Sequence, residues 1–408
     1  MRIGLLAYNS ANNFGALLQL LSTYMYLKNH GQEPIIINYS PLDLEKYYSD
    51  TTPINQLEIN KSFRNTYWVE TRKCRNSNDV AKVIEDERIS AVIIGSDAVL
   101  QHHTFRERIQ FPSKTVVSIK KITEDRLYPN PYWGDFLSFS EKCIPIAMMS
   151  ASSQNSDYKS YGKNIMSQMK HSLSAFCYIS VRDLWTQKMV SHITDGEISP
   201  IVTPDPVFAL NQNYGEQLPT REEIFEKFNI KGRYFVFSFH RRMITQEWIS
   251  SFVNLCRENG YCCYCLPFAN KPSFGTTELS IPFPLSPIDW YCLIKYSDGY
   301  FGNNMHPIVI ALSNSVPFFS FDNYGRSFFN RYFIDEKSSK IYDIIKDANL
   351  LEYRVGCLQR GFVSPSIEHV YNKLLYFDHK TPESFACQQL EKYNKMMTSI
   401  LNNIENEN

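Results

Sequence analysis

The sequence predicts an α/β protein built from two doubly wound domains that face one cleft. Short apolar runs alternate with amphipathic helical patterns along most of the chain, as in βαβ units with parallel strands. The length of 408 residues suits two domains better than one. A polar stretch separates two regions in which strand and helix patterns alternate. This stretch, PDPVFALNQNYGEQLPT from residue 204, contains several prolines and is typical of a linker.

The first region, residues 1–205, opens on a strand, loop, helix and strand. Residues 2–8 and 34–39 are apolar runs, and the amphipathic pattern over 14–30 between them ends at Gly31. Such a crossover between parallel strands is nearly always right-handed. The alternation continues through a predicted helix over 78–88, predicted strands over 91–95, 144–149 and 176–181, and a predicted helix over 184–191. We expect one N-terminal Rossmann-like domain from these elements.

The second region, residues 206–380, repeats the alternation. Its predicted elements are helices over 221–228, 245–259, from 286 and over 306–312, with strands over 233–239, 261–266, up to 301 and over 316–321. Residues 381–408 are predicted to form a C-terminal helix with a polar tail. Because ligand loops follow the carboxyl ends of parallel strands, two such domains place these loops across one interdomain cleft.

Two polar stretches, residues 41–77 and 101–142, fit neither pattern. Both are mixed in charge, contain proline and are longer than ordinary connections. We interpret them as insertions that either shape a substrate opening or only cover the sheet.

Composition narrows the classes of partner. The 42 basic and 42 acidic residues cancel, so the overall charge favours neither nucleic acid nor an anionic membrane. The opening MRIGLLAYNS resembles neither a signal peptide nor a membrane span. Ten scattered cysteines indicate a reducing compartment, and CCYC at 262–265 lacks the second pair that zinc would need. We expect a cytoplasmic protein without a metal site.

Polar residues follow two predicted strands of the first region. The loop NSANNFG at 9–15 offers backbone amides to a ligand, although helix capping by Asn12 or Asn13 explains it more simply. It lacks the three spaced glycines of a dinucleotide fingerprint. Asp97, which closes IIGSD at 93–97, either accepts a proton from a sugar hydroxyl or caps a turn. His102 and His103 are interpreted as surface residues.

Cationic residues close further strands. Arg182 can hold a phosphate or carboxylate at two points, or can pair with Asp183 at the surface. His240 and Arg241 directly follow the strand over 233–239, where they form either an anion cradle or a solvated helix start.

The segment GNNMHPIVIAL at 302–312 is the sharpest signal of the second region. Pro307 places His306 in the first turn of a helix, so backbone donors and the positive end of the helix dipole favour an anion beside the imidazole. A histidine at this position is a candidate for acid catalysis.

Taken in order, these segments resemble the polysaccharide pyruvyl transferase family over about residues 1–325. The resemblance is carried by NNFGALLQ at 12–19, IIGSD at 93–97, Ser152, VRD at 181–183, DPVFAL at 205–210, SPIDW at 286–290 and the His306 segment. The chain departs from the family at Leu100, where a tryptophan is common, at Asp183, where glutamate is common, and at residues 303–307, where Asp-Ser-Phe-His-Gly is common.

The resemblance implies a GT-B-like pair of Rossmann-like domains and a reaction. The enolpyruvyl group of phosphoenolpyruvate would pass to two hydroxyls of a sugar, forming a pyruvate ketal in a surface, capsular or exopolysaccharide. By this resemblance the N-terminal domain holds the acceptor and the C-terminal domain the donor. The implied roles are acid for His306, base for Asp97, donor binding for Arg182, His240, Arg241 and Asn304, and acceptor binding for Asn12, Asn13, Gln19 and Ser96.

The resemblance also implies the partners. Phosphoenolpyruvate is a co-substrate, no further cofactor is implied, and the acceptor would be a hexose within a lipid-linked oligosaccharide at the inner membrane face. Peripheral membrane contact and oligomerisation are both compatible with that acceptor. Two alternatives stay open: a glycosyltransferase that uses a sugar nucleotide on the same frame, and an inactive sugar-binding scaffold.

Overall fold

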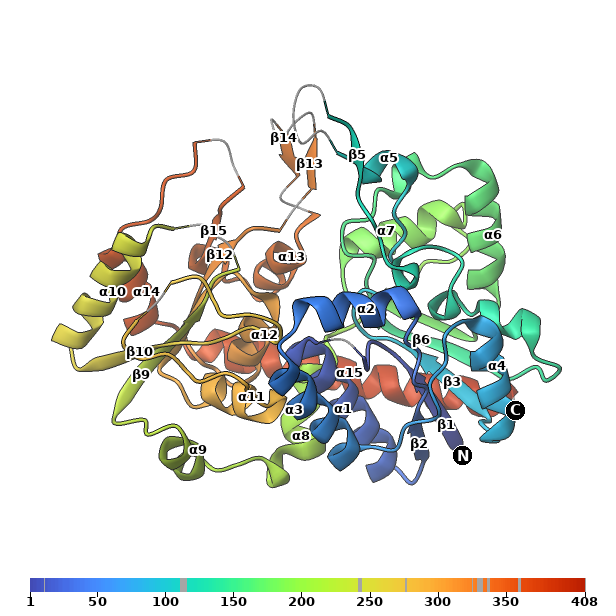
Figure 1. Ribbon diagram of the computed structural model, residues 1–408, viewed down its shortest axis with the longest axis horizontal. Coiled ribbons are helices and arrows are strands. Elements are labelled where there is room, and N and C mark those ends of the chain that lie inside the picture. Colours follow the sequence, from blue (N-terminus) through green and yellow to red (C-terminus); the bar gives the residue numbers. More distant parts are fainter. Residues whose placement is uncertain are drawn as a thin grey trace.

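The computed structural model describes residues 1–10, 12–110, 116–240, 244–275, 277–324, 326–328, 333–335, 338–358 and 361–407. Within them, two parallel β-sheets lie beside each other, each packed against helices (Figure 1). The expected α/β class and the two Rossmann-like units are confirmed.

The N-terminal sheet has six strands in the order β2-β1-β3-β6-β7-β8, all parallel. They are β1 (Arg2–Leu6), β2 (Glu33–Ile36), β3 (Ala91–Ile94), β6 (Ile146–Ala151), β7 (Tyr178–Val181) and β8 (Ile201–Val202). The order reverses beside β1, which makes the carboxyl ends of β1 and β3 the expected place for a ligand. The two-residue β8 was not predicted because so short a run carries no period.

Helices join these strands as crossovers. They are α1 (Phe14–Asn29), α4 (Ser77–Asp86), α6 (Lys163–Ser174) and α7 (Leu184–Ile193). Asn13 caps α1, since its side chain accepts a hydrogen bond from the Gly15 amide, as the capping interpretation predicts. Asp183 caps α7 in the same way and does not pair with Arg182.

The C-terminal sheet has five parallel strands in the order β10-β9-β11-β12-β15. They are β9 (Arg233–Ser238), β10 (Tyr261–Cys265), β11 (Gly299–Gly302), β12 (Phe318–Asp322) and β15 (Arg354–Gly356). Its helices are α9 (Arg221–Lys227), α10 (Gln246–Glu258), α11 (Pro287–Lys295), α12 (Met305–Ser313), α13 (Lys340–Asp347) and α14 (Ile367–Leu375). The CCYC cysteines lie in β10, where Cys263 and Cys265 are buried.

The last helix, α15 (Lys380–Glu407), returns to the first sheet. It contacts α12 of the second unit and then β6 and β7 of the first, and Figure 1 shows it running behind both. Tyr393, Met397 and Ile400 are fully buried along it. The helix therefore ties the end of the chain to the N-terminal sheet.

The stretch after Asp205 is not the solvated linker that its composition indicates. It forms the short helix η5 (Pro206–Ala209) and α8 (Leu210–Tyr214), which pack on α1. Val207 and Leu210 are fully buried. Its polar residues made it look exposed, but Asn213 instead donates hydrogen bonds to Ser22 inside the protein.

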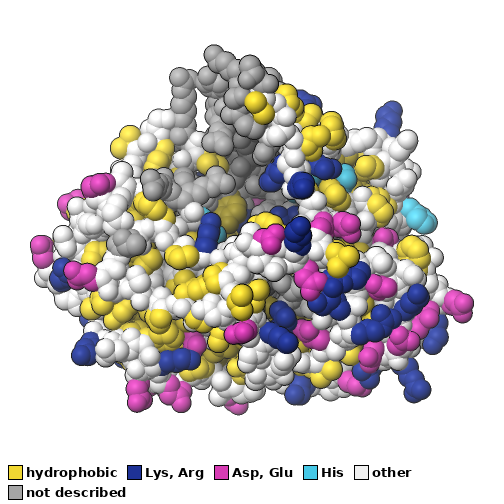
Figure 2. All heavy atoms as spheres, viewed as in Figure 1, with side chains coloured by type: hydrophobic (Ala, Val, Ile, Leu, Met, Phe, Trp, Pro, Cys, Tyr) yellow, Lys and Arg dark blue, Asp and Glu magenta, His cyan; other side chains and the backbone are white. Residues whose placement is uncertain are grey.

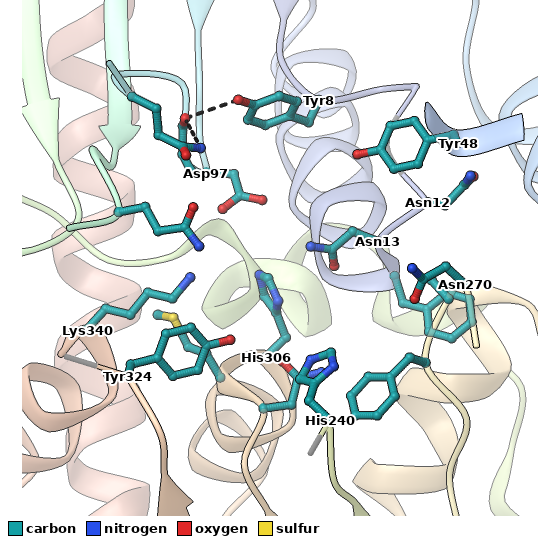
Figure 3. Close-up of a pocket in the computed structure, with 18 of the residues that line it drawn as sticks. Tyr8, Asn12, Asn13, Tyr48, Asp97, His240, Asn270, His306, Tyr324 and Lys340 are labelled. Carbon is teal, nitrogen blue, oxygen red and sulfur yellow. Dashed lines mark hydrogen bonds between the residues drawn. The ribbon is translucent and has the colours of Figure 1, made fainter. Parts of the chain in front are cut away.

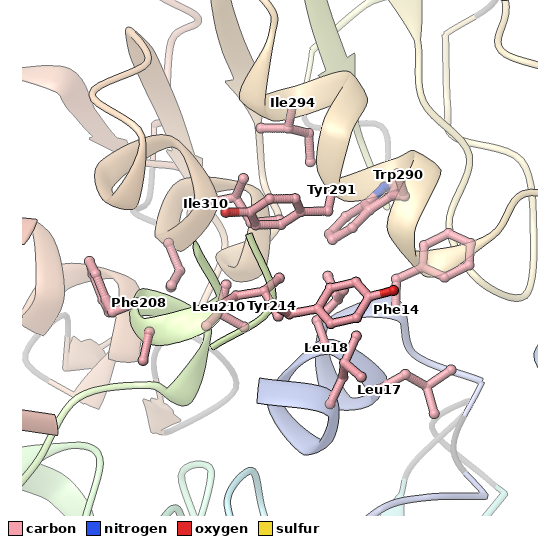
Figure 4. Close-up of a cluster of buried hydrophobic side chains, with 14 of the residues drawn as sticks. Phe14, Leu17, Leu18, Phe208, Leu210, Tyr214, Trp290, Tyr291, Ile294 and Ile310 are labelled. Carbon is pink, nitrogen blue, oxygen red and sulfur yellow. The ribbon is translucent and has the colours of Figure 1, made fainter. Parts of the chain in front are cut away.

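One apolar core joins the two halves. Figure 4 shows Phe14, Leu17 and Leu18 of α1 facing Trp290 and Tyr291 of α11, with the η5–α8 segment beside them. The rings of Phe14 and Trp290 lie 5.3 Å apart. This shared core fixes α1 between the sheets, so its N-terminus opens toward both.

The two insertions are partly helical. Residues 41–77 contain α2 (Leu42–Thr51) and α3 (Ile54–Tyr67), and residues 101–142 contain α5 (Phe105–Arg108), a hairpin of β4 (Ile109–Gln110) and β5 (Ser118–Ile119), and three short 3₁₀ turns. A second hairpin, β13 (Arg326–Phe328) with β14 (Phe333–Asp335), belongs to the C-terminal unit. Among the described residues, no helix combines the length and apolar character needed to cross a bilayer.

The prediction that His102 lies at the protein surface is wrong. Its side chain is buried, its Nδ1 accepts a hydrogen bond from the Tyr128 amide, and its ring packs edge-on against Tyr161. Burial lowers the pKa of His102 to about 4. Because all of its partners belong to distant segments, no local pattern indicated this packing.

Candidate active site

A cavity of about 240 Å³ lies between the two sheets, at the carboxyl ends of their strands (Figure 3). Residues of both the N-terminal and the C-terminal unit line this cavity. The predicted residues that it brings together are Asn12, Asn13, Asp97, His240, Asn304 and His306. Sequence reasoning therefore located the cavity, although it did not identify every side chain in it.

His306 projects from the second position of α12 into this space (Figure 3). A Cβ atom on Gly15 would lie only 2.1 Å from His306 Cγ, so only glycine lets the imidazole pack against α1. Its Nε2 lies 4.0 Å from Asp205 Oδ2 and has no hydrogen-bond partner among the described residues. Burial lowers the pKa of His306 to about 4, although Asp205 and Asp97 oppose the shift. The imidazole is therefore neutral at pH 7.

The start of α12 is open to the cavity. Asn304 occupies the capping position, but its side chain makes no capping hydrogen bond. Asn303 is fully buried and accepts a hydrogen bond from the His240 amide, which connects the ends of β9 and β11. The uncapped first turn leaves a partial positive charge beside His306.

Asp97, Arg182 and Asp205 form a buried ionic network. Arg182 donates from Nη2 to Asp97 at 3.0 Å and from Nη1 to Asp205 at 2.7 Å. Burial by itself would raise the pKa of Asp97, but the Arg182 guanidinium, with Lys340 and His306, lowers it to about 2. Asp97 therefore remains a carboxylate, and its Oδ2 accepts no hydrogen bond from the described residues and is left for a ligand.

The structure does not place Arg182 in this cavity. Its side chain is 3% exposed, and two carboxylates neutralise it. Gln19 is also away from the cavity, since it is buried and donates to Asp205 at 2.6 Å. Ser96 is buried with no partner for its hydroxyl among the described residues, and does not line the cavity either. Arg182 and Gln19 instead hold Asp97 and Asp205 by hydrogen bonds from outside the cavity.

The remaining predictions differ in outcome. His240 stacks on Phe268, with ring centroids 3.7 Å apart, and lines the cavity. Arg241 lies outside the described residues. Asn12 lines the cavity, but both ends of its amide are hydrogen-bonded, to Thr52 and Asn60. It therefore anchors the 41–77 insertion to the loop after β1.

Two cations of the cavity were not predicted from the sequence. Lys340 begins α13 and points into the cavity (Figure 3), and it forms no ion pair with any residue that the structure describes. Burial and the nearby Arg182 lower the pKa of Lys340. Arg126 reaches the cavity from the 101–142 insertion. Both follow polar, irregular stretches, so no strand or helix pattern marked them as site residues.

Aromatic side chains complete the lining. Tyr8, Tyr47, Tyr48, Phe268, Trp290 and Tyr324 border the cavity. Tyr47 and Tyr48 come from α2, which shows that the 41–77 insertion shapes the opening and does more than cover the sheet. Flat rings beside hydrogen-bonding amides suit a sugar, while the cations and the open helix start suit a small anion.

The fold and the interdomain cavity together define a GT-B protein. Solved structures similar to this chain include UDP-GlcNAc 2-epimerase from Neisseria meningitidis bound to UDP-GlcNAc, with a TM-score of 0.56, 10% identity and coverage of 98% of this chain and 100% of that one. UDP-N-acetylglucosamine 2-epimerase from Rickettsia bellii has a TM-score of 0.50, 12% identity and coverage of 98% and 96%. At such identities the likeness establishes the fold alone.

The family follows from the sequence. A model of the family described as polysaccharide pyruvyl transferase matches residues 13–324, so the chain belongs to the polysaccharide pyruvyl transferase family. No curated protein sequence matches the chain. The matched range includes the strands of the first sheet except β1 and those of the second except β15, together with Asp97 and His306, and it stops before Lys340.

Proposed function

We propose that the protein transfers the enolpyruvyl carbons of phosphoenolpyruvate to two hydroxyls of a sugar, releasing phosphate and forming a cyclic pyruvate ketal. A proton adds to C3 of the donor, one hydroxyl oxygen bonds to C2, the C2–O bond to phosphate breaks, and a second hydroxyl oxygen replaces it. One hydroxyl proton restores the acid and the other leaves with phosphate. The observation that carries the proposal is one cavity that holds His306, Asp97 and Lys340 together.

His306 is the proposed acid. It is neutral at pH 7 when no donor is bound, because burial lowers its pKa to about 4. A multiply negative donor in the same cavity would favour the imidazolium form and so raise that pKa. The proton would then be present only when the donor is bound, and C3 would be protonated from the imidazolium.

Asp97 is the proposed partner of the hydroxyls and of the cationic C2. With a pKa of about 2 it is a weak base. A fixed carboxylate nonetheless stabilises positive charge that develops on C2 and can accept a hydrogen bond from the attacking hydroxyl. The buried Arg182 holds Asp97 in place, which gives Arg182 an indirect role in this proposal.

The donor's negative groups would be held by Lys340, His240 and the open start of α12. The cavity volume, about 240 Å³, lies below the usual range of about 300–1,000 Å³ for ligand pockets. This size favours a three-carbon donor over a sugar nucleotide. Asn13 and the tyrosines of α2 would face the acceptor.

The direct test is turnover. The protein is incubated with phosphoenolpyruvate and a panel of hexosides, and phosphate release is followed together with the mass of a pyruvate ketal. We expect one ketal for each phosphate released. Transfer from a sugar nucleotide with no reaction of phosphoenolpyruvate would establish the glycosyltransferase alternative, and binding of glycosides without any turnover would establish the scaffold alternative.

The biological setting belongs to the same proposal. The acceptor would be a hexose of a lipid-linked oligosaccharide that is built into a surface or capsular polysaccharide, at the cytoplasmic side of the membrane. The family's description, which concerns polysaccharides, supports this acceptor class.

Donor binding should take up a proton. Because free His306 is neutral above about pH 4 while the bound donor favours imidazolium, the bound state holds more protons than the free state. Donor affinity should therefore fall as pH rises above neutral, by up to about tenfold per pH unit. Calorimetry in buffers of different ionisation enthalpy measures the uptake, and His306→Gln corrects for the donor's own titration. A binding enthalpy that is independent of buffer in both proteins would contradict the prediction.

Replacing Lys340 by methionine should weaken donor binding by about 10- to 100-fold, because a hydrogen bond to a charged group contributes about 1.5–3 kcal/mol. Calorimetric titration with phosphoenolpyruvate measures the change. Lys346→Met is the matched control, since Lys346 is exposed on the same helix. Equal donor affinity in Lys340→Met and the control would remove Lys340 from the donor site.

A further inference from the structure

The insertion between β3 and β6 exposes an unusual group of apolar side chains. Phe105, Val116, Val117 and Ile119 are 62%, 51%, 64% and 50% exposed. They lie on α5, on β5 and on the two residues before β5, and α5 and β5 are found at the edge of the molecule (Figure 1). We call these residues, with the basic side chains described next, the insertion rim. Contiguous exposed apolar groups mark an interaction surface.

Basic side chains surround this apolar group. Arg106, Arg108, Lys120 and Lys121 belong to the same short segment, and none of them forms an ion pair with a residue that the structure describes. Figure 2 shows hydrophobic and basic side chains together on this part of the surface.

Glu107 lies between Arg106 and Arg108 in the sequence, but it does not neutralise the basic side chains of the insertion rim. Glu107 is engaged elsewhere, since its carboxylate accepts hydrogen bonds from the Thr104 and Asp157 amides. Within the part of the chain that the structure describes, the insertion rim is therefore apolar and its basic side chains form no ion pair.

The same insertion also lines the cavity. Gln101 precedes α5 by a few residues and Arg126 follows Lys121 by a few residues, and both border the cavity between the sheets. The insertion rim and part of the cavity lining therefore belong to the same insertion.

We propose that the insertion rim docks on an anionic lipid bilayer, with its apolar side chains in the interface and its lysines and arginines on the headgroups. Apolar groups flanked by basic ones bind such surfaces through two additive contributions, and each Lys or Arg near an anionic leaflet contributes about 1 kcal/mol. A protein partner with an apolar surface would not require four cations that lack an ion pair with the described residues. The membrane contact stands independently of the proposed reaction, and only the delivery of an anchored acceptor rests on that function.

Sedimentation of the full chain with vesicles tests the proposal. We expect binding to vesicles of phosphatidylglycerol and phosphatidylcholine, weak binding to phosphatidylcholine alone, and loss of binding at high salt. The double variant Lys120→Glu/Lys121→Glu should bind anionic vesicles at least about tenfold more weakly. Val117→Ser/Ile119→Ser should also weaken binding.

Val363→Ser is the matched control, because Val363 is 82% exposed in the C-terminal unit and should bind vesicles like the unaltered chain. Absence of vesicle binding, or equal binding by the insertion rim variants and the unaltered chain, would overturn the proposal. Concentration-dependent self-association without vesicle binding would identify the insertion rim as a contact between copies and would also overturn it.

The outcome is separable from the proposed reaction. Insertion rim variants should keep full turnover on a water-soluble hexoside while losing turnover on the same glycan in vesicles. No turnover of soluble hexosides by the unaltered chain would count against the reaction and would leave the vesicle result unaffected.

Discussion

Arg182→Met should destabilise the folded protein by about 3–5 kcal/mol, a large share of the stability of an ordinary domain. The substitution leaves Asp97 and Asp205 buried without the guanidinium that both contact at 3.0 Å or less. The pKa of Asp97 would then rise from about 2, since burial would no longer be opposed by Arg182. Urea unfolding at pH 7 measures the loss.

The pH dependence gives this prediction a second readout. In the unaltered protein, Asp97 has a lowered pKa and contributes stability that is lost as pH falls through that pKa. In Arg182→Met, Asp97 has no cationic partner, so it becomes protonated already in mild acid. The stability difference between the two proteins should therefore shrink as pH is lowered from 7. Arg257→Met removes an exposed ion pair and should cost no more than about 1 kcal/mol. A similarly small cost for Arg182→Met would show that the network does not stabilise the fold.

His306→Gln should lower kcat by about 10²- to 10⁴-fold, the usual contribution of a positioned acid. Glutamine can fill the space beside Gly15, so the change in packing is limited, but it cannot deliver a proton to C3. Steady-state release of phosphate from phosphoenolpyruvate measures the effect, and thermal unfolding shows whether the variant keeps its fold.

His240→Gln is the informative comparison. His240 lines the same cavity and stacks on Phe268, so its loss should raise KM for the donor while kcat changes by less than about tenfold. The reverse pattern, with kcat lost in His240→Gln and retained in His306→Gln, would assign the acid to His240.

The sequence allowed the fold to be predicted in some detail because its strands are buried on both faces. Runs such as AVII of β3 are continuously apolar, and the patterns of α1 and α10 supply the crossovers between strands. Some elements were not predicted: β8 has two residues, β15 has three, and the helices α2 and α3 expose most of their surface. The helices α6, α13 and α14 were also not predicted.

The site was predicted where a residue ends a strand or begins a helix, as Asp97 and His306 do. The prediction failed for Arg182 because the carboxylates that neutralise it lie 85 and 23 residues away along the chain. Lys340 was missed for the converse reason. It looks like a surface lysine at the start of a polar helix, and only the packing of α13 places its half-buried side chain in the cleft.

The contact between Gly15 and His306 joins opposite halves of the molecule, so the imidazole is dry only while those halves touch. If they part, water reaches the ring and its basicity returns toward that of free histidine. Contact between the two halves without a bound anion would then favour loss of the proton from His306, whereas contact around a bound anion would favour its retention. The protonation of His306 would thus depend on whether an anion is bound beside it.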